Sequence, residues 1–268
     1  MASTVVLKLG SSVLRSANDL PVALREIHSH CRGGSRVVAV VSAFAGVTDR
    51  LFARGAASGL TEHALAECVG AGERESARAL TARLNESGMT ARCLGPETLE
   101  LLALGTALEA TPIGLGPALS VALETTPVIV VPGFIACDEH GRAVLLGRGG
   151  SDLTALFIAQ RLGARCRLLK DVDGVYDRDP AAGAAARRYA TLSWRRALEV
   201  GGELVQPRAI SFAQSRQFEF EVAAASAREG TLVGARGDRF ASAPADARES
   251  LATNGEARCE PAIATTGR

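Results

Sequence analysis

The sequence has few aromatic residues and little net charge. Of its 268 residues 4% are aromatic, and the formal net charge is +1 at pH 7. A nearly neutral chain offers no electrostatic attraction for nucleic acid or for an anionic membrane, and few rings remain on which bases could stack. We therefore expect neither nucleic acid nor a membrane as a partner.

Long apolar runs and cysteine pairs are also missing. No apolar run reaches the roughly 18 residues that a membrane-spanning helix needs. The N-terminus lacks the charged and apolar regions of a signal peptide. The six cysteines form no C-x-x-C pair, which argues against a zinc site and favours reduced thiols over a disulfide framework. These features predict a cytoplasmic protein without a metal site of its own.

Lysine is the scarcest basic residue, because only Lys8 and Lys170 stand beside 28 arginines. A lysine that remains in such a chain can be one whose compact ammonium group arginine cannot replace. Lys8 ends a buried strand predicted over residues 4–9, and the small residues Gly10 and Ser11 follow it. An ammonium group at this edge of a sheet can meet a phosphate. The alternative is a lysine that only extends to solvent.

A glycine-rich turn at residues 147–152, Gly-Arg-Gly-Gly-Ser-Asp, joins a predicted strand to a helix that should end at Gly163. Ser151 and Asp152 are good N-cap residues. Free backbone N–H groups and the positive helix end favour an anion, and Arg148 can hold a carboxylate with two hydrogen bonds. Asp152 has the opposite sign, so we expect it to orient cations. By composition alone the segment can equally be a simple turn, because it lacks both the Walker lysine and the dinucleotide fingerprint.

Two other polar residues lie at expected element ends. Thr48 follows a valine-rich strand predicted over residues 36–41, where its hydroxyl can bind a ligand or cap the next helix. Glu73 opens the second of two helices predicted over residues 61–69 and 73–85. An acid in a first helical turn is usually a partner of the helix dipole, so Glu73 alone is weak evidence for a site.

A segment rich in acids follows the strand predicted over residues 165–169, and it contains Lys170, Asp171 and Tyr176. Such a segment can hold a nucleotide if the tyrosine ring covers the base and the lysine meets the phosphates. The alternative is an acidic surface turn.

The alternation of strands and helices predicts an α/β fold, a three-layer αβα sandwich with a mainly parallel central sheet. This pattern covers residues 1–234. From residue 235 on, small, charged and proline residues mix without a period. We therefore expect residues 235–268 to be a mostly disordered tail.

Several segments between residues 4 and 234 together resemble the aspartokinases of the amino acid kinase superfamily. The segments are K-L-G-S-S-V at 8–13, V-S-A-F-A-G-V-T-D at 41–49, Gly72-Glu73 with Ser76, P-G-F-I at 132–135, the turn at 147–152, and D-V-D-G-V-Y at 171–176 with Asp179-Pro180. The resemblance implies an acceptor-substrate half over residues 1–146 and a nucleotide half over residues 147–234. It also implies ATP with Mg²⁺ as ligands, aspartate as the acceptor, and a homodimer.

The implied reaction is ATP-dependent phosphorylation of aspartate to 4-phosphoaspartate, on the way to lysine, threonine and methionine. By position in the motifs, Lys8 would stabilise the transferring phosphoryl group and Asp152 would orient the cations around it. Arg148 would bind a substrate carboxylate. The other implied acceptor-site residues are Thr48, Glu73, Phe134 and Ser151, and the implied nucleotide-site residues are Lys8, Gly10, Ser11, Lys170, Asp171 and Tyr176.

The chemistry of the side chains agrees with this reaction. A carboxyl group with a reference pKa of about 3.9 is already an anion at neutral pH and needs no general base. The obstacle is repulsion between two anions, roughly 4 kcal/mol for unit charges about 4 Å apart at an effective dielectric near 20. Lys8, Arg148 and magnesium can offset this repulsion, and Glu73 offers a partner for the substrate ammonium.

Departures from the family pattern leave two other functions open. Glu203 stands where the family often has a lysine, and Ala181 where an arginine often follows Asp-Pro. Lys170 or Arg208 could supply the missing charge; otherwise activity is low or lost. The alternatives are a related kinase with another acceptor, because residues 8–14 also resemble glutamate 5-kinase, and a non-catalytic regulatory or assembly subunit.

A third departure is length. Typical aspartokinases continue into regulatory ACT domains, and no segment of that size follows residue 234. We therefore expect no feedback by lysine or threonine through such a domain.

Overall fold

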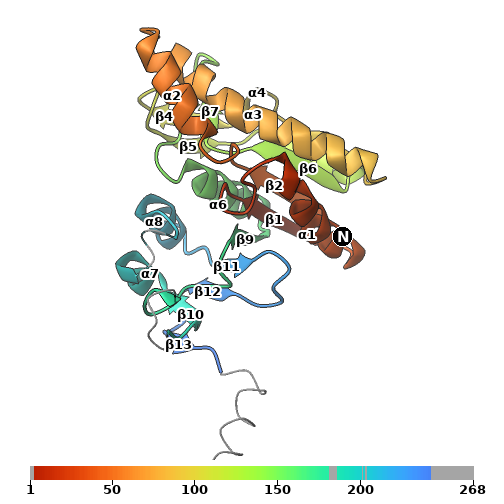
Figure 1. Ribbon diagram of the computed structural model, residues 1–268, viewed down its shortest axis with the longest axis vertical. Coiled ribbons are helices and arrows are strands. Elements are labelled where there is room, and N and C mark those ends of the chain that lie inside the picture. The colour runs from red at the N-terminus through yellow and green to blue at the C-terminus, as the bar shows by residue number, and fades with distance from the viewer. Residues whose placement is uncertain (1–2, 181–185, 201, 203, 243–268) are drawn as a thin grey trace, which may run out of the picture.

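The computed structural model describes residues 3–180, 186–200, 202 and 204–242, which form two sheets with helices around them (Figure 1). In the large sheet all neighbouring strands are parallel except β10 with β13 and β11 with β12. In spatial order its strands are β13 (Arg239–Phe240), β10 (Tyr189–Ser193), β12 (Thr231–Gly234), β11 (Phe220–Ala224), β9 (Arg165–Lys170), β1 (Thr4–Leu9), β2 (Arg36–Val41), β6 (Val128–Pro132) and β3 (Ala91–Cys93). The predicted α/β class with a mainly parallel central sheet is confirmed.

Each face of the large sheet carries its own hydrophobic core. On β2, Val37, Ala39 and Val41 belong to one core, whereas Val38 and Val40 belong to the other. Both faces are covered, which is why the strand is apolar on both sides. The first core includes residues of α1 (Leu20–Arg32) and α3 (Glu62–Glu86); the second includes residues of α4 (Pro96–Leu99), α5 (Ala118–Thr125), α6 (Gly150–Leu162), α7 (Trp194–Val200) and α8 (Pro207–Ser215). The molecule is therefore the predicted three-layer sandwich.

A smaller sheet of four strands lies against the N-terminal part of α3 (Figure 1). Leu65, Ala66 and Val69 of α3 form a third core with Ile135 and Leu145 of this sheet. In spatial order its strands are β5 (Ala110–Gly114), β4 (Leu102–Gly105), β7 (Ile135–Cys137) and β8 (Ala143–Leu145). The remaining described helices are η1 (Ala17–Asp19), which precedes α1, and α2 (Val47–Ala57), which packs on α3.

The structure corrects the prediction of two helices over residues 61–69 and 73–85, because α3 runs unbroken through both. Gly70 and Gly72 lie inside α3 and are buried. A Cβ atom on Gly70 would be 2.6 Å from a side-chain atom of Ile135, so this glycine lets the smaller sheet approach the helix closely. Glu73 consequently lies in the middle of a helix and is not a dipole partner in a first turn. Among the described residues, no helix is both long and apolar enough to cross a membrane.

The start of α6 also differs from the prediction. Its N-cap is Gly149, with a φ of 76°, so Ser151 and Asp152 are not capping residues but lie in the first turn. Gly163 ends the helix in the left-handed conformation, with a φ of 59°, as predicted. The two side chains therefore project from the helix itself, where packing of α6 on the sheet determines their direction.

Ordered structure continues past residue 234, where the tail is predicted to begin. Strand β13 pairs with β10 in antiparallel orientation. The ring of Phe240 stacks on Tyr189 with centroids 4.5 Å apart, and the guanidinium of Arg187 lies 3.8 Å from the centre of the Phe240 ring. Ordered structure therefore extends at least to Phe240, beyond the predicted end of the folded part at residue 234. The aromatic contact explains how a strand of only two residues is held in place. Residues 243–268 lie outside the described residues.

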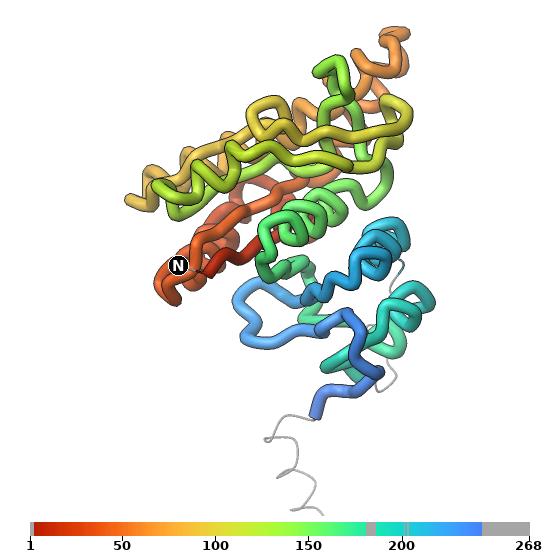
Figure 2. The backbone as a smooth tube through the Cα atoms, turned by 180° about the vertical axis from the view of Figure 1, so that it is seen from behind, coloured from red at the N-terminus to blue at the C-terminus, as the bar shows by residue number. Residues whose placement is uncertain are grey.

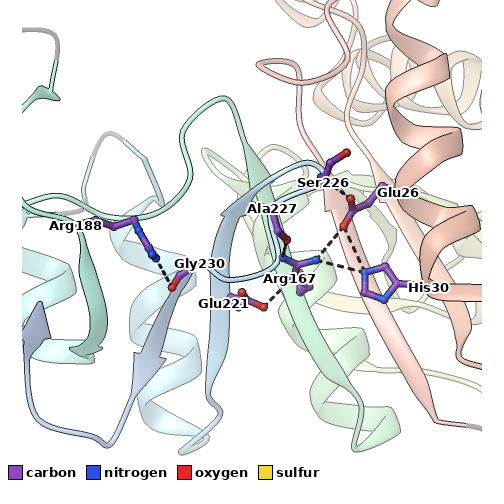
Figure 3. Close-up of polar contacts among 8 residues, drawn as sticks. All are labelled: Glu26, His30, Arg167, Arg188, Glu221, Ser226, Ala227 and Gly230. Atoms are coloured by element: carbon purple, nitrogen blue, oxygen red, sulfur yellow. Dashed lines mark hydrogen bonds and ion pairs between the residues drawn. The ribbon is translucent and has the colours of Figure 1, made fainter. Parts of the chain in front are cut away.

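Arg167 on β9 joins three segments through its guanidinium group (Figure 3). It donates hydrogen bonds to Glu221 on β11 at 2.8 Å, to Glu26 on α1 at 2.9 Å, and to the carbonyl oxygen of Ala227 at 2.8 Å. Glu26 is 3% exposed and also accepts from the backbone N–H of Ser226 at 2.6 Å. Burial alone would raise the pKa of Glu26, but its hydrogen bonds and Arg167 hold the pKa below its usual value. This network ties α1 to the loop between β11 and β12.

Replacing Arg167 with methionine is expected to lower the free energy of unfolding by about 3 kcal/mol. The variant keeps most of the aliphatic volume but leaves the buried, ionised Glu26 without its guanidinium partner, although the His30 imidazole still lies 3.3 Å from it. Urea unfolding followed by circular dichroism measures the change. The matched control is Glu221→Gln, which removes the partner that is 25% exposed and should cost less than about 1 kcal/mol. Equal losses in the two variants would contradict the importance of the buried pair.

Candidate active site

A cavity of about 510 Å³ opens where β1 and β2 end and α6 begins. The carboxyl ends of parallel strands are the usual ligand-binding edge of an α/β sheet. Figure 2 shows α6, in green, across the middle of the molecule, between the red-to-yellow part and the cyan-to-blue part. The predicted site residues that line the cavity are Lys8, Ser11, Thr48, Glu73, Phe134, Arg148, Ser151 and Asp152. All residues predicted to be catalytic or to hold the acceptor are thus brought together.

Asp152 is buried and contacts both lysines of the chain. Its Oδ1 lies 2.8 Å from Nζ of Lys8, and its Oδ2 accepts a hydrogen bond from Nζ of Lys170 at 2.9 Å. Burial by itself raises the pKa of Asp152, but the two ammonium groups outweigh burial and lower the pKa below its usual value. Asp152 is therefore ionised at neutral pH and can fix the position of both lysines.

Gly10 leaves room for the ammonium group of Lys8, although it does not line the cavity itself. A Cβ atom on Gly10 would be 2.5 Å from Nζ of Lys8. Any side chain at this position would displace the ammonium from Asp152 or from the cavity. The small residue after β1 is therefore explained by the space that Lys8 needs.

Glu73 points a buried carboxylate into the same cavity. It is 1% exposed, and its Oε1 accepts a hydrogen bond from the backbone N–H of Ala43 at 3.3 Å. Among the described residues, no donor reaches its Oε2. Burial raises the pKa of Glu73 to about 7, although the Ala43 amide and the Thr48 hydroxyl lower it in part. A buried carboxylate with an unpartnered oxygen is suited to a cationic ligand, since a cation would supply the missing contact.

The glycine-rich turn exposes Arg148 to the cavity, and Arg208 of α8 holds the residue that precedes the turn. Gly147 and Gly149 adopt positive φ angles of 70° and 76°, which a residue with a side chain rarely adopts. Arg148, between them, is exposed at the cavity wall. Arg208 of α8 donates a hydrogen bond to the carbonyl oxygen of Leu146 at 2.7 Å, just before the turn. The turn is thus fixed to α8, while Arg148 has no hydrogen bond or ion pair within the described part of the chain and can meet a ligand.

Phe134 has a positive φ of 69°, which is unusual for a residue with a side chain. Two hydrogen bonds hold it: its N–H donates to Thr154 Oγ1 at 3.1 Å, and its carbonyl oxygen accepts from the N–H of Leu146 at 2.8 Å. Phe134 and Ser151 both line the cavity. Backbone strain of this kind is common at ligand sites.

The predicted nucleotide-site residues do not all meet at one place. Tyr176 lines a second cavity of about 420 Å³ that is formed largely by the segment from Val172 to Pro180, and its hydroxyl donates to Asp173 at 2.7 Å. Asp171 is exposed and lines neither cavity. Lys170 lines neither cavity either, because it turns to Asp152. The spacing of residues 170–176 in the sequence does not indicate that the Lys170 side chain turns toward Asp152.

Three residues line the first cavity without any motif that points to them. They are Phe52 on α2, Leu108 between β4 and β5, and Leu145 at the end of β8. Leu108 and Leu145 belong to the smaller sheet or to a loop between its strands, so the packing of this sheet brings them to the cavity at the edge of the larger sheet. No local pattern in the sequence could have revealed these contacts.

The two substitutions relative to the family pattern, Glu203 and Ala181, lie outside the described residues. Of the two candidates for a replacement charge, Arg208 is engaged with the backbone of the turn and with Thr111, to which it donates at 2.8 Å. It does not line the first cavity. Lys170 remains as the cation close to Lys8.

Comparisons with known proteins agree with this architecture. The family model described as "Amino acid kinase family" matches residues 3–218. An aspartokinase of Bacillus sp. (strain MGA3) is 30% identical over 245 residues, which are 85% of this chain and 58% of that protein. The chain therefore spans less than two thirds of the length of this relative.

Two solved structures show the same fold. An aspartate kinase from Synechocystis matches with a TM-score of 0.75 at 26% identity, over 88% of this chain and 40% of that chain. E. coli aspartokinase III in complex with aspartate and ADP matches with a TM-score of 0.75 at 24% identity, over 87% of this chain and 64% of that chain. At this identity the second likeness concerns the fold alone.

Proposed function

Because the chain belongs to the amino acid kinase family, we propose that it transfers the γ-phosphoryl group of ATP to the side-chain carboxylate of L-aspartate, giving 4-phospho-L-aspartate and ADP. One observation carries the proposal: the Lys8 ammonium and the buried Glu73 carboxylate line the same cavity. The first can receive a phosphate, and the second can receive the ammonium of an amino acid. The similarity to a protein named aspartokinase supports aspartate as that amino acid.

The acceptor is held by groups of opposite charge. Glu73 binds its ammonium group, and Arg148 binds its α-carboxylate with two hydrogen bonds. Thr48, Phe134 and Ser151 surround the rest of the molecule. The side-chain carboxylate then lies toward Lys8 and the start of α6, whose positive end favours an anion.

The transfer itself needs no proton acceptor, because the attacking carboxylate is already ionised. A bond forms between a carboxylate oxygen and the γ-phosphorus, and the bond from this phosphorus to the bridging oxygen of ADP breaks. Lys8 stabilises the charge on the transferring group, and Asp152 holds Lys8 in position. In this scheme the acceptor half is residues 1–146 and the nucleotide half is residues 147–234.

ATP is the second substrate. The ring of Tyr176 in the second cavity is suited to the base, Asp171 lies near it in sequence, and Gly10 and Ser11 lie where the phosphates would approach Lys8. Among the described residues, no group of three or more carboxylate, cysteine or histidine side chains could hold a metal ion. We propose that Mg²⁺ comes with the phosphates of ATP, where it neutralises part of their charge.

The test is formation of aspartyl hydroxamate from aspartate, ATP, Mg²⁺ and hydroxylamine by the purified protein. We expect product that depends on ATP and on L-aspartate. Succinate, which lacks the ammonium group, should be a poor acceptor because it leaves Glu73 without a partner. A product from glutamate but none from aspartate would favour a kinase with another acceptor. A folded protein that forms no product from any acceptor would favour a non-catalytic subunit.

The proposal includes a homodimer in the cytoplasm. Five cysteines in the described part of the chain are free thiols, as is usual for proteins of reducing compartments. Leu104 and Ile113, on the adjacent strands β4 and β5, are 68% and 57% exposed, and apolar groups of this kind are suited to a contact between subunits.

A further inference from the structure

We propose that Lys170 is a second functional lysine of the phosphoryl-transfer site, a positioning residue that acts through Asp152 on Lys8. The inference rests on the function proposed above and changes the role of Lys170 from a nucleotide contact to a part of the reacting cluster. It starts from one geometric observation: the only two lysines of the chain contact the two oxygens of one buried carboxylate.

The strand register explains how the two lysines meet. In the parallel pair of β1 and β9, Lys8 lies opposite Leu168. Side chains two positions apart on a strand share a face, so Leu168 and Lys170 both point to the side of the sheet where α6 packs. Leu168 belongs to the same core as residues of α6. Asp152, in the first turn of α6, therefore faces both lysines from the helix that covers this side of the sheet.

The charges of this cluster do not cancel. Two ammonium groups and one carboxylate leave a net charge of +1 in a buried place, since Lys8 and Lys170 are 7% and 8% exposed. The positive end of α6 adds to this charge. A buried excess of positive charge is unfavourable in the empty protein, and an anion in the cavity would compensate it. Without Lys170, the pair of Lys8 and Asp152 would be neutral.

Lys170 also leaves Lys8 free for a ligand. An ammonium group has three N–H donors, and Lys170 occupies Oδ2 of Asp152, so Lys8 contacts Oδ1. Lys8 also lines the cavity, so its ammonium group can meet a ligand there while it stays paired with Asp152. If Lys170 were absent, both carboxylate oxygens could turn to Lys8 and draw it away from the phosphoryl group. Lys170 is thus a positioning residue, because it lines neither cavity.

The composition of the chain fits a requirement for an ammonium group. Lysine and arginine together number 30, and lysine occurs only at these two positions. The planar guanidinium of arginine is larger and binds in a fork, so it could not share one buried carboxylate with Lys8 in the same way.

The test compares Lys170→Met and Lys170→Gln with the wild-type protein in the hydroxamate assay. Both variants should lower kcat about tenfold to thirtyfold, with the KM for aspartate within twofold, because the acceptor contacts are unchanged. Cys166→Ala is the matched control, a buried change on the same face of β9 that should leave kcat within twofold. Circular dichroism and thermal unfolding check that the variants are folded.

The pH profile separates the electrostatic role from a purely structural one. Burial and the nearby charge of Lys8 both lower the pKa of Lys170. Asp152 on α6 and the adjacent Asp171 raise it, but the pKa still lies below its usual value. The wild-type kcat should therefore fall at alkaline pH as Lys170 loses its proton, and this fall should be reduced in Lys170→Gln.

Three outcomes would overturn the inference: a wild-type kcat in either Lys170 variant, an equal loss in Cys166→Ala, or an unchanged alkaline fall in Lys170→Gln. Wild-type protein that forms no hydroxamate would instead overturn the proposed function, and this inference with it.

Discussion

Replacing Lys8 with alanine is expected to lower kcat for aspartyl phosphate formation by about 10³-fold, near the upper end of the effect of removing one transition-state donor. In the proposed reaction the transferring phosphoryl group meets a carboxylate that carries the same sign of charge, and Lys8 is the lysine that lines the cavity. Its ammonium group is already held by Asp152 at 2.8 Å, so little reorganisation is needed during the reaction. The hydroxamate assay under saturating ATP and aspartate measures the loss.

The structure also provides the controls for this variant. Lys8→Ala leaves Asp152 paired with Lys170, so the protein should remain folded, which thermal unfolding can verify. Lys8→Arg keeps the charge but should restore little activity, because a planar guanidinium is larger than the compact ammonium that lies between Gly10 and Asp152. A kcat within tenfold of wild type in Lys8→Ala would exclude Lys8 from the reaction.

Replacing Glu73 with glutamine is expected to raise the KM for aspartate about hundredfold, with a smaller effect on kcat. The substrate ammonium would lose a charge-assisted hydrogen bond in a buried place, which is worth roughly 1.5–3 kcal/mol. The amide keeps the volume of the side chain and can still accept from Ala43. Initial rates over a range of aspartate concentrations measure the change, and ATP should show an unchanged KM.

The pH dependence of binding tests the same residue. Because burial raises the pKa of Glu73 to about 7, kcat/KM for aspartate should fall about tenfold per unit as the pH decreases below 7. The ionised form of Glu73 is expected to bind the substrate ammonium, and the protonated form is not. In Glu73→Gln this acidic fall should be absent.

The free energy of unfolding of the ligand-free protein should decrease as the pH rises, whereas binding of aspartate should become tighter. The pKa of Glu73 in the folded protein lies above its usual value of 4.5, so the folded state binds the extra proton and stability decreases as the pH rises from 4.5 through 7. Glu73→Gln should therefore increase the free energy of unfolding at pH 8, by up to about 3 kcal/mol, while it weakens binding. Glu75→Gln, an exposed change two positions away on α3, should alter neither property. A variant at Glu73 that binds aspartate normally would refute the assigned contact.

The order of the layers was predictable because its signals are local. Valine-rich strands such as β2 and the helical pattern from residue 150 to Gly163 depend on spacing alone. Strand β4 has no such pattern, since three of its four residues are exposed. The glycines of α3 misled the prediction for a related reason: close packing on Ile135 requires them, and packing partners are not visible in the sequence.

The candidate site was predictable to the extent that its residues end strands or begin helices. Lys8 and Asp152 meet because strand β1 ends where α6 begins, and this geometry follows from the fold class. Lys170 was expected at the phosphates of a nucleotide, yet the parallel register of β9 turns it toward α6. Phe52 and Leu108 reach the cavity only through tertiary packing.

The unbroken course of α3 has a consequence for how this site can vary. One end of the helix packs on the smaller sheet through Leu65 and Val69, and the other packs under the larger sheet through Leu80 and Leu84. Glu73 lies between these anchors. Since a helix turns by about 100° per residue, adding or deleting a single residue between the anchors would rotate one of them out of phase with the carboxylate. The proposed acceptor site should therefore tolerate changes of side chain along α3 far more readily than changes in the length of the helix.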